Sequence, residues 1–164
     1  MSSVFSRRAG KGFTIAELIT VIAIIGILAS VAIPVARFGF RRQKEIELRE
    51  RLRRITDAID RYHDIMTMNR QGPVQPAQQM ALGSEGYPKD LEELLKGIKM
   101  SDGKTIKFIR ERDLIDPMTG RAEWITLSTT DDPDTMSTDG NNVFEVRSTS
   151  TALALDGKTH YNEW

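Results

Sequence analysis

A single carboxylate stands at the border of a long uncharged segment near the start of the chain. Glu17 is followed by Leu18–Ala36, LITVIAIIGILASVAIPVA, a run of 19 residues without a charge. An ionised side chain at the edge of such a run is costly in an apolar medium, so we expect Glu17 to have a cationic partner. Ion pairing, rather than catalysis, is the chemistry that this residue predicts.

Side chains that could support catalysis or bind zinc are few. The chain has no cysteine, which excludes a thiol nucleophile, a cysteine-ligated metal and a disulfide. The two histidines, His63 and His160, are far apart in sequence and have no third ligand at zinc spacing. No Ser-His-Asp pattern, glycine-rich phosphate loop or paired-carboxylate signature stands out. We therefore predict no catalytic residue and no enzymatic activity, and we interpret both histidines as surface or packing residues.

The charges are unevenly distributed along the chain. Lys+Arg and Asp+Glu both total 23, so the formal net charge is zero. Residues 1–12 carry Arg7, Arg8 and Lys11 and no acidic residue, a local charge of +3, which leaves 20 basic and 23 acidic side chains, or −3, for the remainder. A mildly acidic body lacks the basic patch that nucleic-acid binding needs, so we expect no nucleic-acid partner.

The uncharged run is long enough to cross a membrane. At ~1.5 Å per residue its helix would span roughly 28 Å, close to the ~30 Å hydrocarbon core of a bilayer. The basic residues before it predict a cytoplasmic N-terminus and an outer location for everything after Arg37. A cleaved signal peptide would have a shorter apolar region that ends in a small-x-small site, whereas here the small residues Gly10 and Gly12 come first. An uncleaved signal anchor would also explain the run and its basic flank.

Past Arg37 the chain becomes amphipathic. Apolar residues recur at intervals of 6, 3, 4, 3 and 4, at Ile46, Leu52, Ile55, Ile59, Tyr62 and Met66. This near-heptad spacing predicts a helix face packed on a core, and the charges between these positions form a solvated face or meet neighbouring helices in a bundle. We predict one helix from about Thr14 to Met66, on the order of 80 Å long. Its first half has no domain to pack on, so it must insert into lipid or among other subunits.

The C-terminal part predicts a small globular domain. Residues 71–86 are rich in Gln, Pro and Gly and indicate a connecting loop. A short helix is expected over 89–96 and a turn over 116–120. Period-two segments at 105–109, 123–127 and 143–147 predict short antiparallel strands packed over the long helix. The expected fold class is α+β: a long N-terminal hydrophobic helix, lollipop-like, with a small domain of one short helix and an antiparallel sheet.

The stretch Lys11-Gly12-Phe13-Thr14-Ile15-Ala16-Glu17 resembles the processing motif of type IV prepilins and type II secretion pseudopilins. In that family a membrane peptidase cuts after the glycine and N-methylates the new first residue. The resemblance implies cleavage between Gly12 and Phe13, an N-methylphenylalanine at Phe13, and the family's acidic residue at Glu17. Gly26 and Pro34 fall where many members carry a helix-loosening Gly and Pro, and a harmless kink is the alternative for Pro34.

On this resemblance the chain divides into four parts: a basic leader that is removed (1–12), a transmembrane and assembly half of the helix (13–36), an amphipathic half (37–68) and a globular head (69–164). The order of predicted elements in the head is most similar to the major pseudopilin of type II secretion. The implied function is a structural subunit of a pseudopilus that assembles from the inner membrane and drives protein export across the outer membrane. A type IV pilin for adhesion, twitching motility or DNA uptake is the alternative.

The resemblance also implies partners and a location. The partners are further copies of the chain in a helical filament, the prepilin peptidase, minor pseudopilins and an inner-membrane assembly platform. The protein would cross the bacterial inner membrane once, with a cytoplasmic N-terminus, before it enters a filament in the periplasm or at the cell surface. Between subunits, Glu17 of an incoming chain could neutralise the Phe13 amine of one already assembled, which would set the axial register.

Calcium is the one ion that the sequence suggests. Residues 128–142 form an acidic loop that includes Asp139, and clustered oxygen ligands suit Ca²⁺. Major pseudopilins hold calcium in a late C-terminal loop, where this chain offers Asp156, although it departs there from the family's acidic-Gly pattern. The acidic loop thus makes Asp139 a candidate calcium ligand, and the resemblance makes Asp156 a second one. A solvated polar loop is the alternative, and no cofactor is required.

Overall fold

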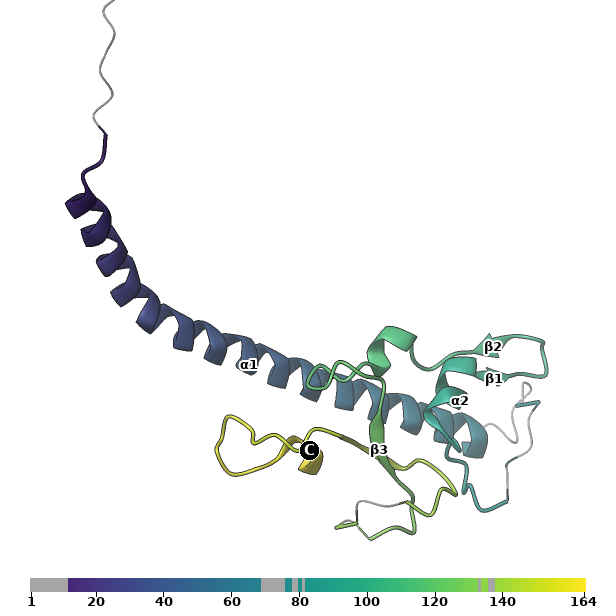
Figure 1. The fold of residues 1–164 in the computed structure, drawn as a ribbon. Helices are drawn as coiled ribbons and strands as arrows, with labels where there is room; N and C mark the ends of the chain where they lie inside the picture. Colours follow the sequence, from purple (N-terminus) through teal and green to yellow (C-terminus); the bar gives the residue numbers. More distant parts are fainter. Residues whose placement is uncertain (1–11, 69–75, 78–79, 81, 133, 136–137) are drawn as a thin grey trace, which may run out of the picture. The chain divides into compact units, whose positions relative to one another are not determined.

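The computed structural model describes residues 12–68, 76–77, 80, 82–132, 134–135 and 138–164. The chain divides into two compact units, one that ends at Phe40 and one that runs from Arg41 to Trp164. The fold is α+β, with a long N-terminal helix, a short second helix and two antiparallel sheets of two strands each (Figure 1).

The first helix, α1, runs from Ile15 to Met68 and comprises 54 residues. At ~1.5 Å per residue it is roughly 80 Å long, which confirms the prediction of one long helix. It ends two residues beyond the predicted end at Met66, and its regular structure continues through Pro34. One helix therefore contributes its first part to the first unit and its second part to the second unit.

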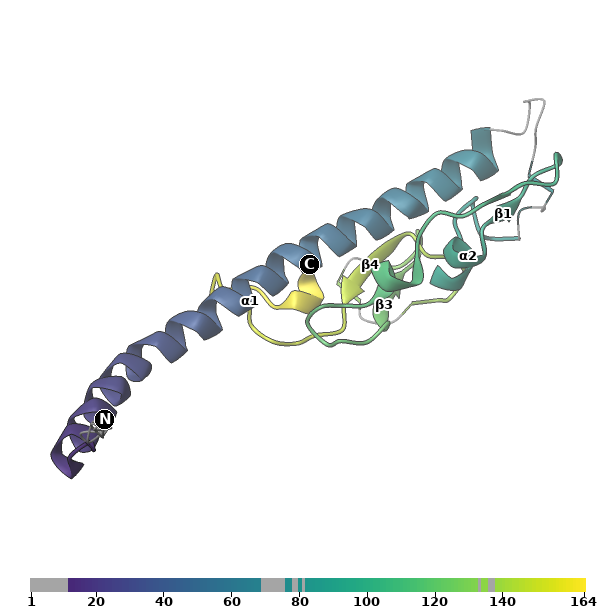
Figure 2. The ribbon, with the colours of Figure 1, turned by 90° about the horizontal axis from the view of Figure 1, so that it is seen from above.

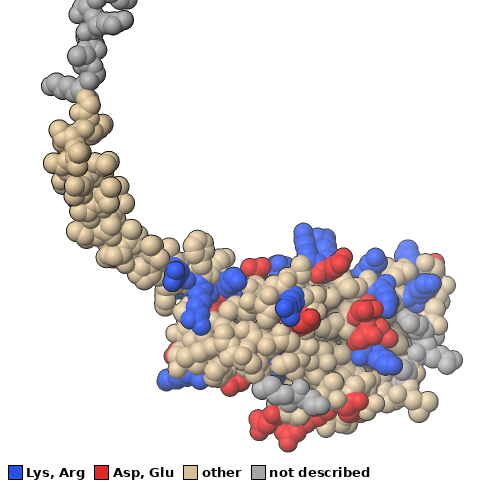
Figure 3. Space-filling model, in the orientation of Figure 1, with Lys and Arg blue, Asp and Glu red and all other residues tan. Residues whose placement is uncertain are grey.

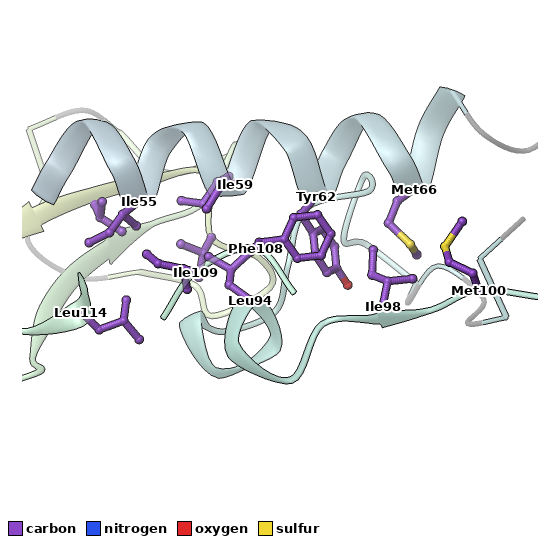
Figure 4. Packing of buried hydrophobic residues seen from close by; sticks show 13 residues of the cluster. Ile55, Ile59, Tyr62, Met66, Leu94, Ile98, Met100, Phe108, Ile109 and Leu114 are labelled. Atoms are coloured by element: carbon purple, nitrogen blue, oxygen red, sulfur yellow. The ribbon is translucent and has the colours of Figure 1, made fainter. Parts of the chain in front are cut away.

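In the second unit, one face of α1 forms one side of a hydrophobic core. Ile55, Ile59, Tyr62 and Met66 are buried there and point toward side chains of the following elements, among them Leu94 and Phe108 (Figure 4). These four positions are 4, 3 and 4 residues apart, so they lie on one side of the helix. The amphipathic pattern of the sequence is thus confirmed over this stretch.

The short helix α2 spans Leu91–Lys96 and begins two residues later than predicted. The Oδ1 atom of Asp90 accepts a hydrogen bond from the backbone N–H of Glu93 at 2.9 Å, which makes Asp90 the N-cap. Gly97 ends the helix with a φ of 78°, and a Cβ atom there would collide with the backbone carbonyl of Ile106. Only glycine fits this position without strain.

Two small sheets lie beside the second half of α1 in both views (Figures 1 and 2). In the first sheet, β1 (Ile98–Lys99) pairs antiparallel with β2 (Thr105–Ile106). In the second, β3 (Trp124–Leu127) pairs antiparallel with β4 (Glu145–Ser148). Two short 3₁₀ helices, η2 (Glu111–Leu114) and η3 (Tyr161–Glu163), complete the elements of the second unit.

The strands are shorter than the sequence pattern predicts. The segment 105–109 is a strand only over its first two residues, because the backbone N–H of Phe108 donates to the carbonyl of Leu94 at 3.2 Å and takes the chain toward α2. The segment 143–147 becomes a strand only at Glu145, because the N–H of Val143 donates to the carbonyl of Pro88 at 2.8 Å. In both segments the period-two pattern of residue types thus extends beyond the residues that pair as strands.

One predicted core residue is not in the core. Ile46 is 53% exposed, while Glu45 next to it is buried together with Leu48. Oε1 of Glu45 accepts hydrogen bonds from the hydroxyl of Tyr161 at 2.8 Å and from the backbone N–H of Leu155 at 2.7 Å. The C-terminal segment therefore packs on the side of α1 that carries Glu45, and the prediction for Ile46 was wrong.

Candidate processing and assembly segment

A capping box begins α1. The carboxylate oxygen Oε2 of Glu17 accepts hydrogen bonds from the backbone N–H of Thr14 at 2.9 Å and from its hydroxyl at 3.0 Å. In return, the hydroxyl oxygen of Thr14 accepts from the backbone N–H of Glu17 at 3.2 Å. This is the T-x-x-E arrangement in which two side chains satisfy backbone donors that the first helical turn leaves open. Sequence reasoning missed Thr14, and the motif at 14–17 is the signal that identifies it.

The predicted cleavage site lies just before this cap. Gly12 and Phe13 precede the helix, and the Phe13 side chain is 87% exposed. A Cβ atom placed on Gly12 would have no neighbour within 4 Å among the described residues. The peptide bond between Gly12 and Phe13 is therefore outside the helix, and no described residue covers it, as a peptidase substrate requires. The leader before Gly12 lies outside the described residues.

The helix that follows presents its apolar side chains on all sides. On the visible face of the space-filling view, no charged side chain interrupts this segment (Figure 3). By length and composition, α1 is able to cross a membrane. The large apolar side chains exposed between 18 and 36 are Leu18, Ile19, Val21, Ile22, Ile24, Ile25, Ile27, Leu28, Val31, Ile33 and Val35.

Burial of these eleven side chains would be strongly favourable. At ~1.5–3 kcal/mol for each side chain, their transfer from water gains about 16–33 kcal/mol. This exceeds the net folding stability of about 5–15 kcal/mol that is typical of a whole domain. The first unit therefore requires lipid or other protein chains around it.

Gly26 and Pro34 both lie inside regular helix. A Cβ atom on Gly26 would meet only open space among the described residues, so packing within one chain does not require glycine there. Pro34 has no N–H and therefore cannot donate a hydrogen bond to the carbonyl of Ser30. One turn earlier, the Ser30 hydroxyl donates to the carbonyl of Ile27 at 2.6 Å. The chain tolerates this missing bond without a break in α1. Loosening of the helix at these residues stays a prediction.

The two candidate calcium ligands are occupied in local turns. The carboxylate of Asp139 accepts from the N–H and the side-chain amide of Asn141 and from the hydroxyl of Thr130, at 2.7–3.0 Å. The carboxylate of Asp156 accepts from the N–H groups of Lys158 and Thr159 and from the Thr159 hydroxyl, at 2.7–3.0 Å. Backbone hydrogen bonds are the main cause that lowers the pKa of each carboxyl to about 2.

Among the residues that the structure describes, no group of three His, Cys, Asp or Glu residues that could hold a metal ion occurs. Calcium binding at Asp139 and Asp156 stays a prediction. His63 stacks on the ring of Tyr87, with 4.2 Å between ring centroids, and Nδ1 of His160 lies 2.8 Å from the carbonyl of Thr151. Both histidines thus have packing or capping contacts.

The comparison with known families bears on the first part of the chain. A family model described as the prokaryotic N-terminal methylation motif matches residues 7–33. This range includes Gly12, Phe13 and Glu17 as well as most of the apolar run. No solved structure matches the chain significantly. The methylation motif at the start of a long, exposed apolar helix supports a membrane-anchored, type IV pilin-like structural protein, and it implies processing by a prepilin peptidase and assembly into a filament.

Proposed function

We propose that this chain is a structural subunit of a type II secretion pseudopilus, which assembles from the inner membrane and drives protein export across the outer membrane. The observation that best supports a filament function is the methylation motif at the start of an apolar helix segment whose side chains are exposed in the described chain. Before assembly, lipid covers this segment. After assembly, the same segments of neighbouring subunits cover one another and form the core of the filament.

Glu17 has an open hydrogen-bonding position for a neighbouring chain. Both bonds from Thr14 go to Oε2, and Oε1 has no hydrogen-bond partner among the described residues. Cleavage after Gly12 would create a cationic amine at Phe13. We propose that Oε1 of Glu17 in an incoming subunit pairs with the Phe13 amine of an assembled subunit. The capping box would then hold the carboxylate in place for that contact, and the ion pair would set the axial position of each subunit.

Two features favour a pseudopilus over a surface pilus. The head has a helix after Tyr87 and Pro88, a turn at Asp116 and Pro117, and then β3 and β4, an order that resembles the major pseudopilin. The chain also has no cysteine, whereas many adhesive and motility pilins close a C-terminal loop with a disulfide. In this function the minor pseudopilins and an inner-membrane platform are the further partners, and the filament stands in the periplasm.

Mass spectrometry of the protein from its native host tests the processing step. We expect the intact mass and the N-terminal peptide to correspond to a chain that starts at Phe13 and carries one N-methyl group. Retention of residues 1–12 in assembled protein would contradict the function, because the Phe13 amine would not exist.

Deletion of the gene tests the kind of filament. A pseudopilus subunit predicts that exported proteins accumulate in the periplasm, while surface pili, motility and DNA uptake persist. Loss of surface pili with normal export would instead favour the type IV pilin function. Complementation with the unaltered gene is the control.

A further inference from the structure

A cavity opens on one flank of α1 in the second unit, between the helix and the segment 107–113. Its volume is about 360 Å³, within the range of ~300–1,000 Å³ that is usual for ligand pockets. We call this cavity the basic pocket, because four basic and two acidic side chains line it. They are Arg54, Arg61, Lys107, Arg110, Asp57 and Asp113.

The acidic residues of the basic pocket do not balance its bases. Oδ1 of Asp113 accepts hydrogen bonds from Arg51 at 2.6 Å and from Arg54 at 3.0 Å, and Arg54 also contacts Glu50 at 3.4 Å. The charges of Arg54 and Asp113 are therefore used within the chain. Asp57 is exposed and forms no ion pair with a described residue. Four bases and two acids leave the lining with a formal charge of +2.

Neutral groups hold Arg61 in the wall of the pocket. Its Nε–H donates to the backbone carbonyl of Asp57 at 3.0 Å, and its Nη2 donates to the backbone carbonyl of Phe108 at 3.4 Å. Carbonyl oxygens orient a guanidinium group but do not remove its charge. Since a guanidinium group has five N–H donors, about three remain for a ligand. Arg61 is thus a preorganised group for binding an anion.

Lys107 and Arg110 lie on either side of two core residues. Phe108 and Ile109, each 8% exposed, belong to the hydrophobic core cluster and line the pocket from that side (Figure 4). Lys107 and Arg110 are exposed, and neither side chain forms an ion pair or hydrogen bond with a described residue. Glu111, next in the chain, is exposed and does not line the pocket. Apolar surroundings strengthen the attraction between these cations and a bound anion.

We propose that the basic pocket binds an acidic peptide segment of a partner protein, with one carboxylate on Arg61 and a second on Lys107 and Arg110. Two carboxylates would balance the charge of +2. The bases come from two different elements, so a ligand with two separated charges uses both, whereas a single small anion uses one. Arginine clusters recognise acidic motifs through such charge-assisted hydrogen bonds. This inference concerns the second unit alone and does not depend on the proposed function.

The spacing of the two carboxylates follows from the geometry of an extended peptide. Side chains two residues apart project from the same side and are roughly 7 Å apart along the chain. A Glu-x-Glu segment therefore presents both carboxylates to one pocket. This makes Glu-x-Glu the simplest peptide that represents the proposed partner.

NMR titration of the full-length protein in micelles of an uncharged detergent tests the proposal. The probe is the peptide acetyl-Gly-Glu-Gly-Glu-Gly-amide, and the same peptide with glutamine at both glutamate positions is its control. We expect the glutamate peptide to shift the Nε–H signal of Arg61 and the backbone N–H signals of Phe108 and Arg110 in a saturable way. The glutamine peptide should leave them unchanged. The affinity should fall at least several-fold between about 0.01 M and about 0.15 M salt.

A pair of neutralising substitutions identifies the residues that bind. Lys107→Gln together with Arg110→Gln should weaken binding of the glutamate peptide at least about threefold, because two exposed cations are lost. Each substitution alone should give part of this loss. The matched control is Lys89→Gln together with Lys99→Gln, which removes the same charge from exposed positions that do not line the pocket. Near-UV circular dichroism confirms that every variant keeps its fold.

The other results overturn the proposal in distinguishable ways. Absence of shifts at Arg61 at low salt would show that the pocket binds no acidic peptide. Equal weakening by the two pairs of substitutions would indicate a general attraction to the protein surface. Inorganic phosphate that binds as tightly as the glutamate peptide would indicate a site for single anions. Tighter binding of a peptide with the sequence of residues 128–142 would assign the pocket to a second copy of the chain instead of a different partner.

Discussion

Oε2 of Glu17 accepts two hydrogen bonds from Thr14, one from its backbone N–H at 2.9 Å and one from its hydroxyl at 3.0 Å. The acidic residue of the processing motif is therefore part of the helix start, and its side-chain position is fixed before any second chain arrives. Substitution of Glu17 removes this cap and, under the proposed assembly contact, also the partner of the Phe13 amine, so the two effects must be separated.

Thr14→Ala should loosen the first turn of α1 and leave Glu17 charged. Removal of an N-cap hydroxyl typically weakens a helix start, and we expect the amide protons of Glu17 and Leu18 to exchange roughly two- to tenfold faster in detergent micelles. Hydrogen exchange followed by NMR measures this. Thr14→Ser keeps the hydroxyl and is the matched control, so equally fast exchange in both variants would contradict the cap.

Glu17→Ala should be cleaved and methylated normally but fail to enter filaments. The expected loss of assembly is tenfold or more, because the Phe13 amine of the neighbour would be buried without its partner. Sedimentation of sheared filaments, together with mass spectrometry of the membrane-bound protein, separates assembly from processing. Thr14→Ala is the control for loss of the cap alone. Assembly of Glu17→Ala at the level of the unaltered protein would eliminate the register role of Glu17.

Sequence periodicity predicts the long helix and most of its buried face, because the intervals between apolar residues along the chain determine which residues share one side of a helix. Ile55, Ile59 and Met66 repeat at helical intervals, and each is buried as expected. At the start of this face the same reasoning fails, since Ile46 is apolar and Glu45 is charged. The hydroxyl of Tyr161, 116 residues away in the chain, decides which of the two faces inward. A contact of that sequence separation has no local signal.

The N-terminal methylation motif can be recognised from the sequence for a related reason. Gly12, Phe13 and Glu17 form a contiguous motif, so a sequence pattern contains nearly all the information about their arrangement. The candidate calcium ligands Asp139 and Asp156 are different, because they belong to separate loops and their carboxylates form hydrogen bonds with their own neighbours. Whether two loops converge depends on tertiary packing, which residue composition does not specify.

Tyr161→Phe should destabilise the second unit by about 1–3 kcal/mol, because Glu45 would lose a hydrogen-bond donor in a buried position. Thermal or urea unfolding of the full chain in micelles, followed by near-UV circular dichroism, measures this change. Tyr87→Phe is the matched control, since Tyr87 is only partly buried and its hydroxyl has no hydrogen-bond partner among the described residues. Equal effects of the two substitutions would show that the Glu45 contact adds nothing specific.

Calcium should not change the stability of the head. The carboxylates of Asp139 and Asp156 each accept three hydrogen bonds from their own loops, and among the described residues neither belongs to a group of three side chains that could hold a metal ion. We expect the Tm of the full-length protein with excess Ca²⁺ and with chelator to agree within about 1 °C, whereas a bound structural ion would raise it by several degrees. A reproducible rise that disappears in Asp156→Asn would place a calcium site in the C-terminal loop.

The acid sensitivity of the C-terminal turn should depend on Asp156. Its folded-state pKa of about 2 lies below the usual aspartate value, so the folded state binds this proton less readily than the unfolded state. The resulting stabilisation is complete above the usual pKa and is lost as the pH falls toward 2. The difference in Tm between the unaltered protein and Asp156→Asn should therefore shrink from pH 5 to pH 2. Asp64→Asn is the matched control for the loss of a carboxylate, because the Asp64 carboxylate accepts no hydrogen bond among the described residues. A constant difference for Asp156→Asn would mean that the backbone donors at Lys158 and Thr159 do not stabilise the charged form.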